Sequence, residues 1–277
     1  MIKVFKILIL LILVNIASVH SQNFTDQGIS SGSSIILLPT GSVAPSSNFR
    51  VQYHHFTFFK NHSFNSIDVT GGFSSHLELY LKYATEINGH VLPASVTGFG
   101  GKFQFPFEIP FIYRAAIWAE KINSTASDKI VLFPADMTRF GVVASVYTNA
   151  IEPTVFLGIN KIDKGTRFLG SVGSTYSVSR DYKLGLEFTY GYFGNHDYTS
   201  LLSLTSRIFS NLGLQVTGGY IAGTTVKSWT VSAGISLTTG AIDFSPRKEQ
   251  EARQTVPSFD DIMKSLDENK EETKENK

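Results

Sequence analysis

Apolar and polar residues alternate with a period of two along the middle of the chain. In residues 182–192 every even position is aromatic or leucine, whereas every odd position is glycine, threonine or charged. Residues 228–237 and 77–84 carry a similar alternation. Successive side chains of a β-strand point to opposite faces, whereas a helix would spread these residues around its whole surface. The pattern therefore predicts β-strands with one apolar face.

Segments of this kind follow one another along the chain. We predict twelve strands, at 49–59, 64–73, 76–87, 96–105, 111–122, 138–148, 153–162, 166–177, 182–193, 198–208, 212–222 and 226–238. The connectors contain turn-forming sequences such as Asn88-Gly89 and Lys164-Gly165, and only 123–137 is a longer irregular stretch. Short connectors make the sheet an antiparallel meander. A meander of this length is expected to close, because closure removes its exposed edges.

The amount and distribution of charge indicate which classes of protein this chain can belong to. Only 17% of the residues are charged, the net charge is +1 and there is no cysteine; soluble domains average about 25% charged residues. Seven basic and nine acidic residues are concentrated in 245–277. These figures exclude a strongly basic nucleic-acid binder and a cysteine-based metal or redox site. No cofactor motif and no spaced metal ligands are present, so neither is expected.

The first residues have the layout of a secretory signal peptide. Lys3 and Lys6 precede an apolar run at 7–14, and small residues follow up to Ser21. The alternative is an uncleaved anchor, but this run is far shorter than the ~20 residues that a spanning helix needs. Export with cleavage near Ser21 is therefore expected.

An exported, charge-poor β-region is either a soluble β-domain or a transmembrane barrel. A soluble domain needs a charged outer face, but here the face opposite the apolar one is mostly glycine, serine, threonine and alanine. We therefore predict an all-β, up-and-down antiparallel transmembrane barrel of about twelve strands, within a range of ten to fourteen. The expected parts are a signal peptide (1–21), a periplasmic lead-in (22–47), the barrel (48–244) and a charged periplasmic tail (245–277).

Three short motifs resemble the opening of bacterial outer-membrane β-barrels. They are Pro39-Thr40-Gly41-Ser42-Val43-Ala44-Pro45, Gly71-Gly72-Phe73 with His76-Leu77-Glu78-Leu79, and Gly98-Phe99-Gly100-Gly101-Lys102-Phe103. The similar families include exopolysaccharide-associated and porin-like barrels of diderm bacteria, and the resemblance covers residues 35–120. It implies a membrane location, a barrel fold and a role in transport. It implies no catalytic residue.

Charged residues that alternate with the apolar face are expected to line the lumen. They are Glu78, Lys82, Lys102, Arg114, Glu120, Arg139, Lys183, Glu187 and Arg207. The basic excess could attract anions and set the selectivity of a pore. Alternatively, these side chains pair across a narrow barrel and fill it.

Histidines beside acidic or hydroxyl residues occur in two predicted outer turns, at His62-Ser63 and His196-Asp197. A histidine at the rim of a barrel can act as a base, but turn composition explains both pairs equally well. We therefore expect no enzymatic activity.

The tail contains one amphipathic segment, 258–267. Phe259, Ile262, Met263 and Leu266 fall on one helical face, behind a start that resembles a capping box. This face is a candidate for docking a periplasmic partner or for returning into the barrel mouth. The alternative is a solvated, mostly disordered tail, since so short a helix is marginal in water.

Taken together, these features predict an outer-membrane channel or transporter for small polar or anionic solutes. The alternative is a non-conducting structural or assembly barrel, for example in envelope polysaccharide export, whose tail binds a periplasmic protein. The expected partners are outer-membrane lipid, the barrel-insertion machinery and that periplasmic protein. No nucleic acid is expected.

Overall fold

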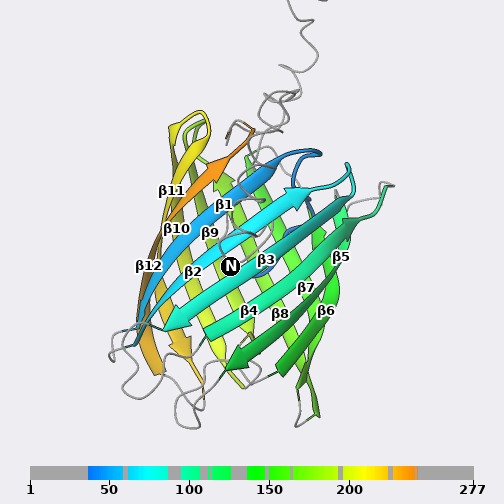
Figure 1. The fold of residues 1–277 in the computed structure, drawn as a ribbon, viewed down its shortest axis with the longest axis vertical. Coiled ribbons are helices and arrows are strands. Elements are labelled where there is room, and N and C mark those ends of the chain that lie inside the picture. Colours follow the sequence, from blue (N-terminus) through cyan, green and yellow to red (C-terminus); the bar gives the residue numbers. More distant parts are fainter. Residues whose placement is uncertain are drawn as a thin grey trace, which may run out of the picture.

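The computed structural model is a closed β-barrel (Figure 1). It describes residues 37–58, 62–86, 95–106, 112, 114–125, 136–146, 150–162, 165–192, 196–223, 227–240 and 242. The strands are β1 (Phe49–Phe58), β2 (His62–Gly72), β3 (Leu77–Glu86), β4 (Ser95–Gln104), β5 (Arg114–Thr125), β6 (Asp136–Ser145), β7 (Ile151–Ile162), β8 (Gly165–Ser177), β9 (Tyr182–Tyr190), β10 (Tyr198–Phe209), β11 (Leu212–Ala222) and β12 (Lys227–Thr238). No helix among these residues is long and apolar enough to cross a membrane.

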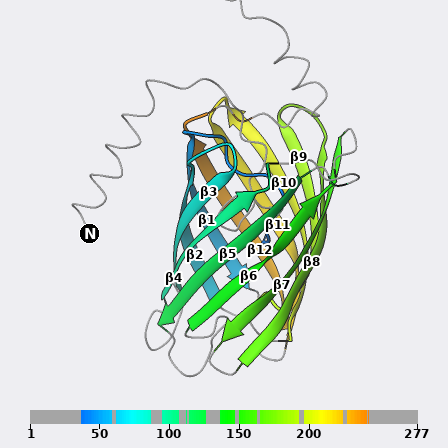
Figure 2. The same cartoon turned by 90° about the vertical axis from the view of Figure 1, so that its right-hand side faces the viewer.

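Each strand pairs with its neighbours in the sequence, and Figure 2 shows β5 to β8 side by side. The last strand pairs with the first. All pairings are antiparallel, and β1 meets β12 with Arg50 opposite Thr238. The predicted closed antiparallel barrel of twelve strands is confirmed, and every predicted strand end lies within three residues of the observed one. The alternation located the strands well because each one has an apolar face and a polar or small face.

The apolar face of the strands points outward. Along β12, the residues from Trp229 to Leu237 alternate between exposed apolar and buried serine, threonine or glycine positions. Leu81, Val172 and Leu202 are each more than half exposed on the outer wall. An exposed apolar band of this kind is what a membrane-spanning barrel presents to lipid.

Aromatic residues gather on the outer wall near both ends of the barrel. At the end where β1 begins, the rings of Phe49 and Phe73 make an edge contact, with centroids 6.4 Å apart. At the opposite end, the centroids of Tyr220 and Trp229 lie 5.3 Å apart. Two aromatic girdles around an apolar band are typical of outer-membrane barrels.

One residue departs from its predicted face. The alternation places Tyr192 outside with Tyr182 and Phe188, yet Tyr192 is buried. β9 ends at Tyr190, and Gly191 follows with φ at +77°, a left-handed conformation that glycine adopts readily. This turn carries the Tyr192 side chain into the barrel.

Candidate functional site

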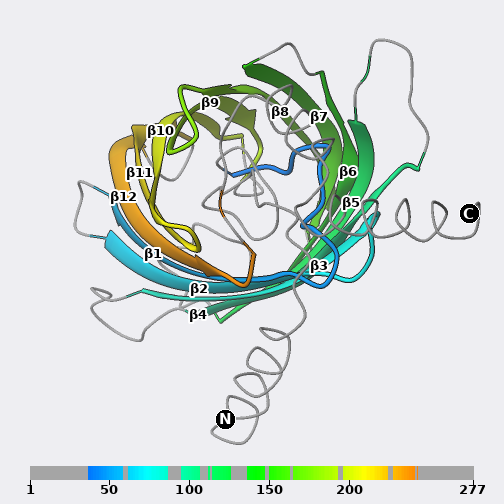
Figure 3. The same ribbon diagram turned by 90° about the horizontal axis from the view of Figure 1, so that it is seen from above.

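Residues 37–48, which we call the inner segment, lie inside the barrel before β1 begins. Figure 3, viewed along the barrel, shows this blue part of the chain crossing the opening. Four of its backbone N–H groups donate to side chains of the wall: Leu37 and Leu38 to Glu187 Oε2 (3.0 and 3.5 Å), Gly41 to Ser145 Oγ (2.9 Å) and Ala44 to Glu78 Oε2 (2.5 Å). The described part of the expected lead-in therefore contacts the inner wall.

Two basic side chains of the neighbouring strands β4 and β5 also contact the segment. Lys102 Nζ donates to the backbone oxygen of Thr40 (3.1 Å), and Arg114 Nη1 donates to Ser42 Oγ (2.8 Å). Lys102 also lies 3.8 Å from Glu78. The wall thus contacts the inner segment through groups of both signs.

The inner segment reaches β1 through a tight turn at the barrel mouth. Ser47 has φ at +60°, and its N–H donates to the backbone oxygen of Gly72 (2.8 Å). Asn48 N–H donates back to Pro45 (3.1 Å). Ser46 forms one isolated bridge to Gly72. Pro39 also forms an isolated bridge. The described part of the segment belongs to no strand of the barrel, and side chains of the wall contact it.

An apolar cluster occupies the lumen beside the inner segment. Leu37 and Leu38 belong to it together with inward-facing residues of the wall, among them Tyr80, Trp118 and Phe156. Trp118 Nε1 donates to Tyr80 Oη (2.6 Å), and the rings of Trp118 and Phe156 meet edge to face at 5.4 Å. The sequence reasoning missed this cluster, because these aromatic residues share the inward face with glycines and charges.

Glycines on neighbouring positions make room for the large inward rings. A Cβ on Gly100 would collide with the phenol ring of Tyr80, and one on Gly141 or Gly158 would lie within 2.8 Å of Phe156 Cζ. The inward glycines are therefore partly explained by close packing. The apolar cluster and the described inner segment therefore occupy part of the lumen.

Most of the predicted lumen charges are buried in the structure. Glu120 and Arg139 form an ion pair at 3.3 Å, with both side chains almost completely enclosed. Arg139 Nη2 also donates to the backbone oxygen of Tyr192 (2.8 Å), and its guanidinium carbon lies 4.4 Å from the centroid of that ring. Such a pair needs hydrogen bonds besides its mutual attraction to offset its desolvation.

The other predicted charges lie on several strands. Lys82 on β3 is near the pair, since a Cβ on Gly98 would lie 3.6 Å from Lys82 Cβ and 3.7 Å from Glu120 Oε1. Lys82 is half-buried and faces Asp68 across the β2–β3 register, and Lys183 is buried on β9. Arg207 lies at the end of β10, where its Nε donates to Asp181 Oδ1 (2.7 Å). The nine charges therefore do not gather in one ring.

The sequence reasoning also missed inward polar residues on β1 and β2. Arg50, His54 and Asp68 are each 1% exposed. The same alternation could have identified them, because Val51, Tyr53, Ile67 and Val69 are the apolar residues between them. His54 and His55 are adjacent and both polar, so this part of β1 does not alternate between apolar and polar residues.

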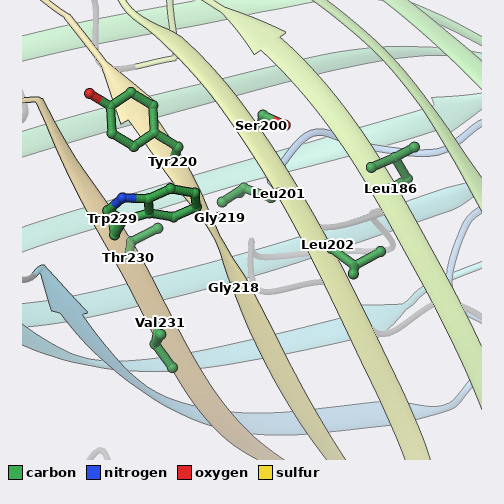
Figure 4. Close-up of a pocket in the computed structure, with 10 residues that line it drawn as sticks. All are labelled: Leu186, Ser200, Leu201, Leu202, Gly218, Gly219, Tyr220, Trp229, Thr230 and Val231. Carbon is green, nitrogen blue, oxygen red and sulfur yellow. The ribbon is translucent and has the colours of Figure 1, made fainter.

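A hollow of about 700 Å³ opens on the outer wall and not in the lumen (Figure 4). It is bounded by exposed side chains including Leu202, Tyr220, Trp229 and Val231, and Gly218 forms part of its floor. A Cβ on Gly218 would touch nothing within 4 Å. The hollow is a gap in the outer apolar belt.

The other candidate residues are only partly described. His196 Nδ1 lies 2.5 Å from Tyr190 Oη in an exposed aromatic group, and the side chain of His62 is outside the described residues. So are the signal peptide and the docking candidates Phe259, Ile262, Met263 and Leu266. Among the described residues, no group of three or more histidine, aspartate or glutamate residues could hold a metal ion.

Comparisons with known proteins identify the fold. No protein-family model and no curated protein matches the chain. Among solved structures, the KdgM porin in complex with disordered oligogalacturonate is similar, with a TM-score of 0.54 and 12% identity over 68% of this chain and 98% of that one. A second KdgM porin structure gives 0.51 with the same identity and coverage. The NanC porin in a rhombohedral crystal form gives 0.48, with 10% identity over 68% of this chain and 98% of that one. At this identity the likeness concerns the fold alone, and the chain has the fold of an outer-membrane β-barrel of the porin type.

Proposed function

We propose that the protein is an outer-membrane channel for small polar or anionic solutes, closed in this structure by its inner segment. The observation that carries the proposal is the way residues 37–48 occupy the lumen. The contacts described above are isolated bridges, single hydrogen bonds and the packing of Leu37 and Leu38, and the segment belongs to none of the twelve strands. A segment held in this way can leave the lumen without breaking any pairing between barrel strands.

The charges behind the inner segment support a preference for polar or anionic solutes. Lys102, Arg114 and Glu78 all contact the segment and would face the lumen water once it leaves. Basic side chains outnumber acidic ones among the predicted inward charges. A basic excess in a constriction favours anions. The complex of the KdgM porin with oligogalacturonate is an example of a barrel of this fold that binds a saccharide.

Conductance in planar bilayers tests the proposal. The full chain is expected to give rare openings, and deletion of residues 22–44 is expected to give sustained step currents. Pro45–Asn48 are retained because they form the turn at the barrel mouth. Deletion of the tail, 245–277, is the control and is expected to leave the rare openings unchanged. A folded 22–44 deletion that carries no current would refute the channel.

The packing inside the lumen also favours a second function, a non-conducting barrel in envelope assembly or polysaccharide export. In that case the apolar cluster and the ion pairs serve stability, and the tail 245–277 recruits a periplasmic protein through Phe259, Ile262, Met263 and Leu266. Affinity capture from the native envelope, with the full chain and with the tail deletion, tests this alternative. The same captured proteins with both would remove the docking role of the tail.

The location and the remaining partners are part of the proposal. The signal-like residues 1–21 would direct export, and the outer apolar band would contact outer-membrane lipid after the insertion machinery has placed the barrel. The even number of strands would leave the tail in the periplasm. No enzymatic activity is proposed, and substitution of His196 and His62 by alanine is expected to leave the function unchanged.

A further inference from the structure

Five inward polar residues form a continuous patch on the side of the lumen made by β1, β2, β11 and β12. We call this patch the polar wall, and its members are His54, Ser66, Gln215, Thr217 and Ser232. The backbone register joins them: Ser66 lies opposite His54, and His54 lies opposite Gly234. Gly234 lies opposite Gln215, and Ser232 lies opposite Thr217.

The side-chain polar atoms of the polar wall are buried without hydrogen-bond partners. Each of the five residues is at most 4% exposed. In the part of the chain that the structure describes, seven of their atoms have no hydrogen-bond partner: both ring nitrogens of His54, both amide atoms of Gln215, and the hydroxyl oxygens of Ser66, Thr217 and Ser232. Buried polar groups in folded proteins are nearly always paired, because an unpaired one is costly.

On the opposite side of the lumen, a buried hydroxyl group has a hydrogen-bond partner. Thr154 on β7 is as deeply buried as Gln215, but its hydroxyl is hydrogen-bonded to Ser145 Oγ at 2.8 Å. Ser145 in turn accepts from the inner segment through Gly41 N–H. The seven unpaired atoms lie on β1, β2, β11 and β12, whereas the side chains described above as contacting the inner segment lie on β3, β4, β5, β6 and β9.

We propose that the polar wall binds a neutral, polyhydroxylated solute, a short oligosaccharide, when the lumen opens. The seven atoms mix donors and acceptors and carry no formal charge with His54 neutral. Sugar hydroxyls donate and accept in the same way, whereas an anion only accepts and would leave the acceptor nitrogen of neutral His54 and the amide oxygen of Gln215 unpaired.

Aromatic rings flank the polar wall on one side. Phe56 lies opposite both Ser232 and Phe64 in the backbone register, and its ring centroid is 6.1 Å from that of His54. Both phenylalanines are half-buried. A few polar groups beside an apolar surface are the usual composition of a small-molecule site.

This inference rests on the proposed function, because the polar atoms are closed off in the present state. It also sharpens that function, since it assigns a neutral solute to this wall, while Lys102 and Arg114, which contact the inner segment, lie on β4 and β5. The buried charged residues beside the wall, Arg50 on β1 and Asp68 on β2, have opposite signs. The closed arrangement leaves the seven atoms unpaired, and a bound solute would pair them.

Calorimetric binding of maltotriose to the full chain in detergent tests the inference. The measurement uses the wild-type chain and Glu187→Gln, which weakens the hold on Leu37. Saturable binding is expected for both, and it should be tighter for Glu187→Gln because more of that chain has an open lumen. Gln215→Leu is expected to weaken binding about tenfold. Digalacturonate and inorganic phosphate are the anionic comparisons and are expected to bind more weakly.

A matched pair of threonine substitutions separates binding from structure. Thr217→Val removes an unpaired hydroxyl, so it should weaken maltotriose binding without lowering the thermal midpoint. Thr154→Val removes a paired hydroxyl, so it should lower the midpoint without weakening the binding. Absence of maltotriose binding, tighter binding of the anions, or equal affinity for Thr217→Val and wild type would each overturn the inference. The planar-bilayer currents are recorded without sugar. They therefore test the channel proposal independently of maltotriose binding.

Discussion

Arg139 and Glu120 are two oppositely charged residues enclosed by the barrel wall. Arg139→Gln would leave the carboxylate of Glu120 buried beside the fully enclosed Tyr80 and Trp118. We expect this substitution to lower the free energy of unfolding by about 3–5 kcal/mol, the usual cost of removing one partner of a buried pair. Urea titration of the barrel refolded in lipid vesicles measures it.

The control is an ion pair of the same type on the outside. Lys121 and Asp136 lie 3.7 Å apart with their side chains 35% and 56% exposed. Lys121→Gln should change the free energy of unfolding by less than about 1 kcal/mol. Equal changes in the free energy of unfolding for Arg139→Gln and Lys121→Gln would mean that Glu120 is hydrated in the folded protein.

Gly100 leaves space for the ring of Tyr80 because it has no side chain. In Gly100→Ala, the new Cβ would meet the ring of Tyr80 and the backbone oxygen of Ala119, at 2.7 Å. We expect a loss of about 1–3 kcal/mol in the free energy of unfolding, together with a shift in the emission of Trp118, which donates to Tyr80. Gly218→Ala, which adds a methyl group to an open hollow, should leave stability and emission unchanged.

The inner segment is an element whose position can be followed by chemical labelling. The chain has no cysteine, and Leu38 is 1% exposed. In the channel proposal, Leu38→Cys reacts slowly with a maleimide. Glu187→Gln should increase the rate several-fold, because the amide is a weaker acceptor than the carboxylate for the N–H of Leu37. Mass spectrometry over time measures the modification.

A cysteine at an exposed position provides the reference for this rate. Phe73, between β2 and β3, is 58% exposed, so Phe73→Cys should react rapidly and equally with and without Glu187→Gln. Rapid labelling of Leu38→Cys in the unaltered chain would mean that the inner segment does not rest in the lumen. Equal Leu38 labelling rates in both backgrounds would mean that Glu187 does not retain it.

The whole molecule presents an apolar outer wall and a hydrogen-bonded ring without sheet edges. We therefore expect the folded protein to require detergent or lipid and to migrate faster than the heated protein on gels, because a closed barrel resists unfolding by dodecyl sulfate at room temperature. A product that stays dispersed without detergent would contradict the membrane location. Deletion of 245–277 should leave this shift intact, since β1 and β12 close the ring by themselves.

The strand pattern could be predicted from local sequence because the two faces of each strand meet different surroundings. Leu184 and Leu186 point outward while Lys183 and Glu187 point inward, as the alternation of 182–192 indicates. The rule fails at Tyr192, where the left-handed turn at Gly191 redirects the next side chain. A single backbone angle of this kind leaves no mark in a pattern of period two.

The sequence by itself determined the strands, their faces and the antiparallel order, because alternation and short turns are local properties of the chain. Only the tertiary structure decided what fills the barrel. The contact of Leu37 with Glu187 joins residues 150 positions apart, and the polar wall brings β1 and β2 beside β11 and β12 through the closing pair. Ring closure sets these distances, and no spacing within one strand encodes them.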